Sequence, residues 1–195
     1  MKVNEIFYSL QGEGFHSGTP AVFVRMSGCN LHCPFCDTQH ENGTEMTEDT
    51  IVEEVSHFSA KLVVVTGGEP ALQLTATLVD KLHAIGKHVA VETNGTRPLP
   101  ENVDWITLSP KDAFVGPQAA PVIKHADELK VVYDGIHPPQ HIPLLESSIP
   151  HYFLQPCDTG DPIRNDEIVQ SAIEYIKSNP QWRLSLQIHK ILNIR

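Results

Sequence analysis

Short runs of β-branched and other apolar residues alternate with longer amphipathic stretches along the chain. Six runs are rich in Val, Ile, Leu and aromatic residues and predict strands: AVFVRMS (21–27), KLVVVT (61–66), HVAVET (88–93), WITLS (105–109), LKVVY (129–133) and YFLQ (152–155). Several of these runs are apolar at nearly every position, which is typical of parallel strands covered on both faces.

Three of the stretches between the predicted strands repeat their apolar residues at helical spacing. They cover residues 47–58, 71–86 and 165–180. The apolar faces of the first two consist of Ile51, Val52, Val55 and Phe58, and of Leu74, Leu78, Leu82 and Ile85. Candidate N-caps are Thr47, with Thr50 in place of the Glu of a full capping box, and Asn165. Gly86 is a candidate C-cap.

Strand–helix alternation predicts an α/β fold with a mainly parallel sheet. About six strands are too few for a closed eight-stranded barrel, so we expect a partial parallel (β/α) barrel. The chain length of 195 residues suits a single domain over residues 1–195. The segments 110–128 and 134–150 are rich in Pro and His and predict loops or short irregular helices.

Polar motifs follow five of the six predicted strands. In parallel α/β folds, ligands bind beyond the carboxyl ends of the strands, so these motifs are expected to meet at one rim. In chain order they are SGCNLHCPFC (27–36), TGGEP (66–70), ETNGT (92–96), SPK (109–111) and QPCD (155–158).

Charge and composition narrow the class of partner. Acidic residues outnumber basic ones by 24 to 14, the net charge is −10, and no Lys/Arg-rich run occurs. We therefore expect a small-molecule substrate and no nucleic-acid partner. No apolar run approaches the roughly 20 residues of a membrane span, and the N-terminus does not resemble a signal peptide. We expect a cytoplasmic protein, where thiols stay reduced and clustered cysteines more often bind metal than pair.

Three of the four cysteines, Cys29, Cys33 and Cys36, form a C-x3-C-x2-C motif. A structural zinc site needs four protein ligands, and His32, His40 or Cys157 could complete one, so zinc remains an alternative. On a four-iron cluster, in contrast, three thiolates leave one iron without a protein ligand. An open metal position is typical of a catalytic site.

The cysteine motif followed by TGGEP (66–70) resembles the signature of the radical S-adenosylmethionine (SAM) superfamily. This resemblance implies a radical SAM core, a [4Fe-4S] cluster and SAM as cofactors. In that superfamily the open iron is chelated by SAM, and an electron from the cluster cleaves SAM to a 5′-deoxyadenosyl radical. Flavodoxin or ferredoxin is the implied electron donor.

Further motifs resemble one family within this superfamily, the 7-carboxy-7-deazaguanine synthases. They are LQGEG (10–14), FVR (23–25), CDT (36–38), ETNGT, SPK, LQP-D and, near the C-terminus, LQ-HK. The resemblance implies conversion of 6-carboxy-5,6,7,8-tetrahydropterin to 7-carboxy-7-deazaguanine with loss of ammonia, in queuosine and deazapurine biosynthesis, by a Mg²⁺-assisted homodimer. A glycyl-radical-activating enzyme and a non-catalytic zinc-binding module are the alternatives.

The resemblance also implies roles for individual residues. Cys29, Cys33 and Cys36 would ligate the cluster, and Thr38 would bind Mg²⁺. The residues implied to bind SAM are Phe35, Cys36, Asp37, Gly68, Glu69, Ser109, Pro110, Lys111, Gln155, Pro156, Cys157 and Asp158, joined by Glu92 and Asn94. The residues implied to bind the substrate are Leu10, Gln11, Gly12, Glu13, Arg25, Thr66, His189 and Arg195.

Two of these substrate residues have specific partners, because a carboxylate accepts two parallel N–H bonds and a guanidinium donates two. Glu13 would read the guanidine-like edge of the pterin, and Arg25 would pair with the substrate carboxylate. The chain departs from the family pattern at Ile188, where Thr is usual, and at Arg195, because family members often end in proline.

Overall fold

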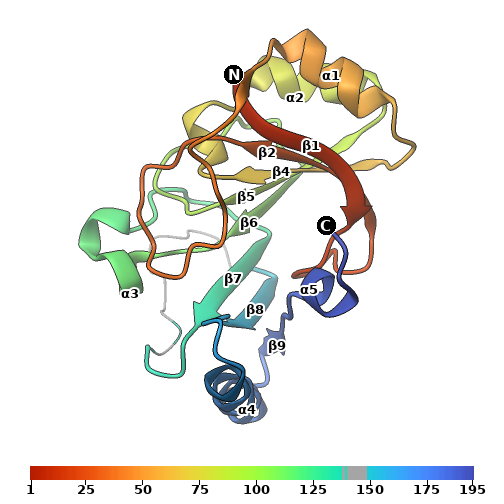
Figure 1. The fold of residues 1–195 in the computed structure, drawn as a ribbon. Coiled ribbons are helices and arrows are strands. Elements are labelled where there is room, and N and C mark those ends of the chain that lie inside the picture. The colour runs from red at the N-terminus through yellow and green to blue at the C-terminus, as the bar shows by residue number, and fades with distance from the viewer. Residues whose placement is uncertain (138, 140–148) are drawn as a thin grey trace.

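A curved sheet lies at the centre of the fold in the computed structural model (Figure 1). The structure describes residues 1–137, 139 and 149–195, and within them the sheet has nine strands in the order β3-β1-β2-β4-β5-β6-β7-β8-β9. The six predicted strands are all present: β2 (Pro20–Met26), β4 (Leu62–Gly67), β5 (His88–Thr93), β6 (Trp105–Leu108), β7 (Glu128–Tyr133) and β8 (His151–Pro156). They run parallel, which confirms the α/β prediction, and the arrangement is consistent with a partial barrel.

Three strands were not predicted: β1 (Lys2–Leu10), β3 (Thr44–Glu45) and β9 (Trp182–Leu184). β1 is antiparallel to β2, while β9 extends the parallel part beside β8. β1 lacks a continuous apolar run because only part of it is buried: Val3 and Phe7 face the core, and Tyr8 is exposed. β3 and β9 are too short to produce a recognisable pattern.

The described residues form five α-helices. Their bounds are α1 (Glu48–Ser56), α2 (Ala76–Ala84), α3 (Asp112–Val115), α4 (Pro162–Ser178) and α5 (Ile188–Leu192), with 3₁₀ turns at η1 (Pro70–Leu72) and η2 (Pro117–Ala119). The prediction of loops or short irregular helices for 110–128 is confirmed by the short α3 and η2, apart from Glu128 at the start of β7. Most of 134–150 lies outside the described residues. No helix in the described part of the chain is both long and apolar enough to cross a bilayer.

The structure confirms one predicted N-cap and the C-terminal Gly86, and it corrects two helix boundaries. The Thr47 side chain accepts the N–H of Thr50, as predicted. Helix α4 begins earlier than expected, because the Asp161 side chain accepts the N–H groups of Ile163 and Arg164 and Pro162 occupies the first helical position. Asn165 is therefore inside the helix.

Helix α2 begins later than expected, at Ala76, after its N-cap Thr75. Its predicted apolar face is buried at Leu78 and Leu82, and Leu74 just before the helix is buried as well. Ile85 is 39% exposed because it lies beyond the last helical residue.

Two apolar layers cover the outer face of the sheet, and a third fills part of its inner face. Helices α1 and α2 pack on β2, β4 and β5, and α4 packs on β8 and β9. On the inner face, Phe7, Phe23, Val64 and Ala90 form a small apolar cluster with Trp105. Side chains alternate along a strand, so the next inward position on β2 is Arg25, opposite Thr66 on β4. The inner face thus changes from apolar to polar toward the carboxyl ends of the strands.

Candidate active site

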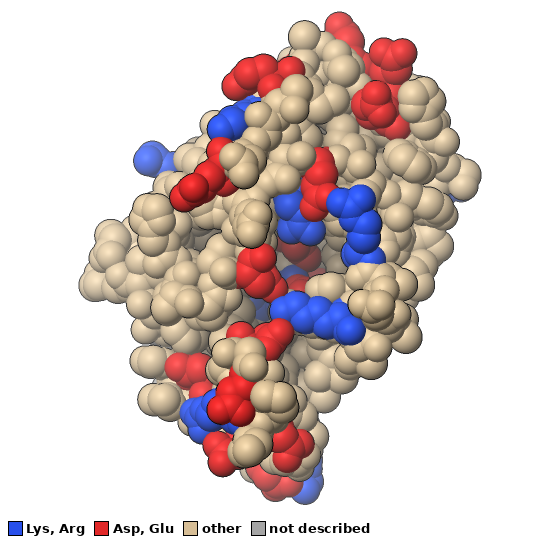
Figure 2. Space-filling view, viewed as in Figure 1, with Lys and Arg blue, Asp and Glu red and all other residues tan. Residues whose placement is uncertain are grey.

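A cavity of about 640 Å³ opens on the inner face at the carboxyl ends of the parallel strands. In Figure 2, acidic and basic side chains alternate around the middle of the face that is viewed. Such a volume lies in the range of small-molecule sites. All five motifs that follow the predicted strands contribute residues to this cavity, as expected from the common direction of the parallel strands.

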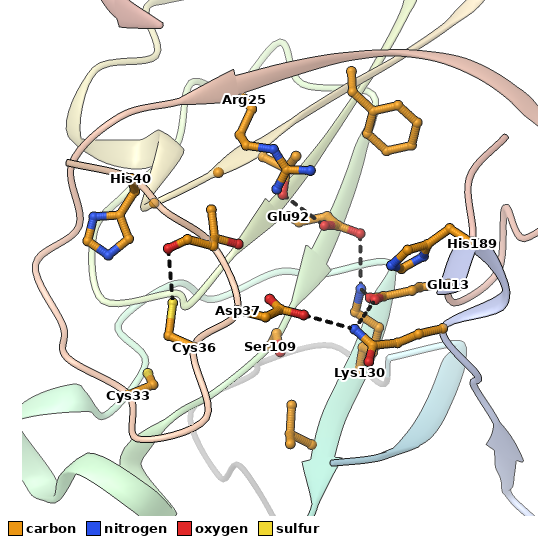
Figure 3. Close-up of a pocket in the computed structure, with 18 of the residues that line it drawn as sticks. Glu13, Arg25, Cys33, Cys36, Asp37, His40, Glu92, Ser109, Lys130 and His189 are labelled. Atoms are coloured by element: carbon orange, nitrogen blue, oxygen red, sulfur yellow. Dashed lines mark hydrogen bonds and ion pairs between the residues drawn. The ribbon is translucent and has the colours of Figure 1, made fainter. Parts of the chain in front are cut away.

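The cavity is lined by every predicted site residue except Pro110, which is buried beside it. Figure 3 shows Cys33 and Cys36 on one side of the cavity, and Arg25, Glu92, Glu13, Lys130 and His189 on the other. Glu92 and Asn94 also line the wall. The arrangement therefore separates a thiol-bearing half from a charged half.

The three cysteines of the motif lie on the loop that follows β2. Cys29 and Cys33 are partly buried and Cys36 is exposed. The loop is closed at its base by a hydrogen bond from the Gly28 N–H to the His40 carbonyl, at 2.7 Å. Burial raises the pKa of the Cys29 and Cys33 thiols, so metal binding there must release protons.

No group of three or more His, Cys, Asp or Glu in the described residues is arranged around a single metal ion. A four-iron cluster is larger than one ion, and its three thiolates stand further apart than the ligands of a zinc site. The donor set, with three free thiols on one cavity wall, fits an iron–sulfur cluster with an open iron.

The TGGEP turn fixes the cysteine loop against β4. The Glu69 N–H donates to the Gly28 carbonyl at 2.9 Å. The Glu69 side chain is 1% exposed and accepts from Thr93 Oγ1 at 2.7 Å and from the Asn94 N–H at 2.8 Å. Glu69 therefore acts within the protein by joining the ends of β4 and β5.

The wall next to the cysteines carries several predicted SAM residues. Lys111 Nζ donates to Ser109 Oγ at 2.6 Å, and burial lowers the pKa of Lys111. Lys190 Nζ joins Asp37 and Asp158 across the cavity mouth, at 3.0 and 2.8 Å. Hydrogen bonds from Lys190 and neighbouring groups lower the pKa of Asp158 to about 2.

Glu13, Glu92 and Lys130 form a buried charged cluster in the other half of the cavity. Lys130 Nζ lies 2.5 Å from Glu13 Oε2 and 3.0 Å from Glu92 Oε1. Burial alone would raise the pKa of Glu13, but the charge and hydrogen bond of Lys130 lower it to about 2. Conversely, burial would lower the pKa of Lys130, but the attraction of Glu13 and Glu92 raises it.

Lys130 and Gln187 line the cavity but were not predicted as site residues from the sequence. Lys130 interrupts the apolar run LKVVY, and a lysine inside a buried strand needs a charged partner. That signal could have identified it. Gln187 donates to Glu13 Oε1 at 3.1 Å across 174 positions, and nothing local to its sequence indicates this contact.

Arg25 is oriented by a partner from β1. Its Nε donates to Glu5 Oε1 at 2.9 Å, and its guanidinium lies over the Phe7 ring. Arg195 pairs with the other oxygen of Glu5 and also lies over Phe7. The C-terminus thereby lies beside β1, where Ser9 Oγ donates to the Arg195 carbonyl at 2.5 Å.

The LQGEG loop and the C-terminal segment contact each other. The Ile188 N–H donates to the Gly12 carbonyl at 3.1 Å. A Cβ atom on Gly12 would lie 2.4 Å from Nδ1 of His189, so only glycine lets the histidine pack there. Two motifs from opposite ends of the chain thus form one wall.

Comparison with known proteins agrees with this geometry. The family model described as the radical SAM superfamily matches residues 23–121, and the chain belongs to that superfamily. A Bacteroides thetaiotaomicron protein named "7-carboxy-7-deazaguanine synthase" is 52% identical over 100% of this chain and 98% of its own length. A Haemophilus influenzae protein of the same name is 37% identical over 97% and 92%.

Structural similarity extends over the same length. The structure titled "Crystal structure of QueE from Escherichia coli" covers 95% of this chain and 92% of its own, with a TM-score of 0.74 and 27% identity. The chain belongs to the 7-carboxy-7-deazaguanine synthase family. These findings confirm the resemblance drawn from the motifs and support neither a glycyl-radical-activating enzyme nor a zinc-binding module.

Proposed function

We propose that this chain converts 6-carboxy-5,6,7,8-tetrahydropterin to 7-carboxy-7-deazaguanine with loss of ammonia, as a step in queuosine or deazapurine biosynthesis. The observation that carries this proposal is a single cavity that joins three free thiols to the charged groups Glu13 and Arg25. The full-length similarity to proteins of that name supports it. One continuous sheet supports a single domain over residues 1–195.

In this proposal the two halves of the cavity hold different molecules. Cys29, Cys33 and Cys36 hold the [4Fe-4S] cluster, and the wall with Gly68, Ser109, Lys111, Gln155 and Asp158 holds SAM. When bound and reduced, these cofactors supply a carbon-centred radical that removes a hydrogen atom from the substrate.

The charged half orients the pterin. Glu13 accepts the two parallel N–H bonds of its guanidine-like edge, and Arg25 donates to its carboxylate. Glu5 accepts the hydrogen bond of Arg25 Nε, so both terminal nitrogens of the guanidinium are left to donate to the substrate carboxylate. His189 and the Gly12 backbone cover the bound ring, and α5 excludes water from the mouth.

The direct test is an anaerobic assay on cluster-reconstituted protein. It contains SAM, dithionite, Mg²⁺ and 6-carboxytetrahydropterin, and product is followed by mass spectrometry. We expect 7-carboxy-7-deazaguanine and one ammonia per product, and neither without SAM. Cleavage of SAM without this product would support the radical chemistry and show that the pterin is not the substrate.

We further propose that Thr38 helps to hold Mg²⁺. It lines the cavity on the cysteine loop, and its hydroxyl is an oxygen donor of the kind that Mg²⁺ prefers. Substrate carboxylate and water would complete the shell, as Mg²⁺ commonly requires. Removal of divalent ions should slow product formation, and Mg²⁺ should restore it. Thr38→Ala should raise the Mg²⁺ concentration needed, Thr38→Ser should not, and equal rates with and without Mg²⁺ would contradict the proposal.

Arg25→Lys is expected to raise KM for the pterin roughly 10- to 100-fold, because lysine cannot donate two fixed bonds to the carboxylate while also pairing with Glu5. Arg183→Lys is the matched control. Arg183 also lies over a phenylalanine ring, at 4.9 Å from Phe153, but does not line the cavity. Steady-state kinetics of both variants measure the difference. An unchanged KM in Arg25→Lys would show that another group binds the carboxylate.

The reductant and the assembly state are also proposals. The family chemistry needs one electron per activation, and we propose a flavodoxin or a ferredoxin as its donor. Replacing dithionite by each reduced protein in the same assay tests this. We propose a homodimer in solution, which light scattering of the purified chain measures directly.

A further inference from the structure

The side chain of Lys130 is charged, 6% exposed, and placed beneath the proposed pterin site without an assigned role. It reaches from the middle of β7 to two carboxylates on other elements, Glu13 of the LQGEG loop and Glu92 of β5. A buried ammonium is costly unless it is paired and hydrogen-bonded. This structure pairs it twice.

The hydrogen bonds that Glu13 makes within the protein leave some of its acceptor sites for a ligand. Lys130 occupies one site on Oε2, Gln187 occupies one site on Oε1 at 3.1 Å, and the Gln155 side chain is a further donor next to the carboxylate. An ionised carboxylate has about two acceptor sites on each oxygen, so each oxygen can accept one further bond. Lys130 and Gln187 therefore fix the side chain, and its remaining acceptor sites can take two parallel N–H groups in place of the Gln155 contact.

The second carboxylate has a different environment. Glu92 Oε1 accepts from Lys130 and, at 3.3 Å, from Gln11 Nε2, while Oε2 accepts from Thr66 Oγ1 at 2.9 Å. Glu92 is thus held by three protein donors, and it shares the charge of Lys130 with Glu13. Two carboxylates against one ammonium leave a surplus negative charge, which suits a ligand edge made of N–H donors.

The ionisation of Glu13 depends on this ammonium. Burial favours the protonated acid, and Lys130 provides the largest opposing effect. The other charged or titratable groups around the pair are Glu92 on β5, Lys111 after β6, Glu128 on β7, Asp37 in the cysteine loop and His189 on α5. Of these, Lys111 is the other lysine, but burial lowers its pKa, and no hydrogen bond joins it to Glu13 among the described residues.

We infer that Lys130 is a positioning residue for pterin recognition, which holds Glu13 as an oriented carboxylate so that both of its oxygens accept N–H bonds from the 2-amino and ring N–H edge of the substrate. This inference rests on the proposed function, because it assumes that a pterin occupies this half of the cavity. Without Lys130, Glu13 takes up a proton. One of its oxygens then donates instead of accepting, and selection for the amino group is lost.

Two stable ligands test this directly. Pterin-6-carboxylate carries the 2-amino group, and lumazine-6-carboxylate has an oxygen in its place. Binding of each to the cofactor-loaded enzyme is measured by fluorescence or calorimetry between about pH 5 and pH 7, where Glu13 of the wild type stays ionised because the pKa is about 2. We expect wild-type protein to prefer the pterin roughly 10- to 100-fold, with little dependence on pH.

Lys130→Met should lose most of this preference at the acidic end of the range and regain part of it as pH rises. The sign follows from Glu13: once burial dominates, the pKa rises, and the ionised acceptor forms only at higher pH. Lys130→Gln, which keeps polarity without charge, should behave in the same way, and Lys130→Arg should restore the preference. Lys87→Met is the matched control, since in the described part of the chain Lys87 Nζ donates to the Phe58 and Ala60 carbonyls and does not line the cavity.

The alternative outcomes are distinguishable. If both neutral variants bind the two ligands more weakly by one factor at every pH, Lys130 has only a structural role and the inference is overturned. Wild-type preference retained in the variants overturns it as well, while the proposed function stands. Equal wild-type affinity for pterin and lumazine refutes the proposed substrate together with this inference. In kinetics, the expected variant effect is on KM at low pH rather than on kcat.

Discussion

Cys33→Ala is expected to remove the iron–sulfur cluster and product formation together while leaving the fold intact. Cys33 is the middle cysteine of the motif, and it lines the cavity together with Cys29 and Cys36. The backbone turn of the loop, in which the Cys36 N–H donates to the Cys33 carbonyl at 3.1 Å, does not use the thiol. Alanine therefore keeps the loop and removes only a ligand.

The expected measurement is iron and sulfide per chain after reconstitution, with visible absorbance and turnover on the same sample. Two remaining thiolates cannot hold a cluster that depends on three, so both iron content and product should fall to background. The unfolding midpoint of the metal-free protein should be unchanged. SAM cleavage should also be absent, because no reduced cluster is present to donate an electron.

Cys157→Ala is the matched control for iron content. Cys157 is the remaining cysteine, and it is buried at the carboxyl end of β8 with a pKa raised by burial. Its variant should load as much iron as the wild type. If Cys157→Ala lost the cluster and Cys33→Ala kept it, the assigned ligand set would be incorrect.

The sequence predicted the parallel strands because each is buried on both faces and therefore apolar along its length. Val63, Val64 and Val65 illustrate this, since all three are at most 1% exposed although they point to alternate faces of β4. β1 escaped prediction because its polar positions face the cavity or solvent. Its Glu5, which orients Arg25, is among those polar residues.

The convergence of the site was predictable because parallel strands present their carboxyl ends on one side. The contacts within the site were not. Lys130, Glu92 and Glu13 belong to elements far apart in the chain, and their pairing depends on the register of β5 against β6 and β7. Pairing between Lys190 and Asp37 likewise depends on where α5 returns beside the cysteine loop. The sequence signals that Lys130 needs a charged partner, but it contains no local signal for which residues those partners are.

Gly68→Ala is expected to disturb the cysteine loop strongly, because the added methyl group collides with that loop. A Cβ on Gly68 would lie 1.9 Å from the carbonyl oxygen of Gly28, which directly precedes Cys29. The same carbonyl accepts the Glu69 N–H, so it cannot move without breaking the connection between the loop and β4. Overpacking of this kind typically costs about 1–3 kcal/mol, and here the added methyl group meets backbone atoms, so no neighbouring side chain can turn away.

The consequence reaches the cofactors, because the displaced carbonyl positions the first cluster ligand. Gly68→Ala should therefore bind less iron, cleave SAM slowly and unfold at lower urea concentration. Gly86→Ala provides the comparison: Gly86 has φ +76° and no atom near a Cβ, so it tests a strained backbone without a collision. That control should cost about 1–2 kcal/mol and keep full iron content. Normal iron loading and SAM cleavage in Gly68→Ala would show that the cysteine loop is held independently of the TGGEP turn.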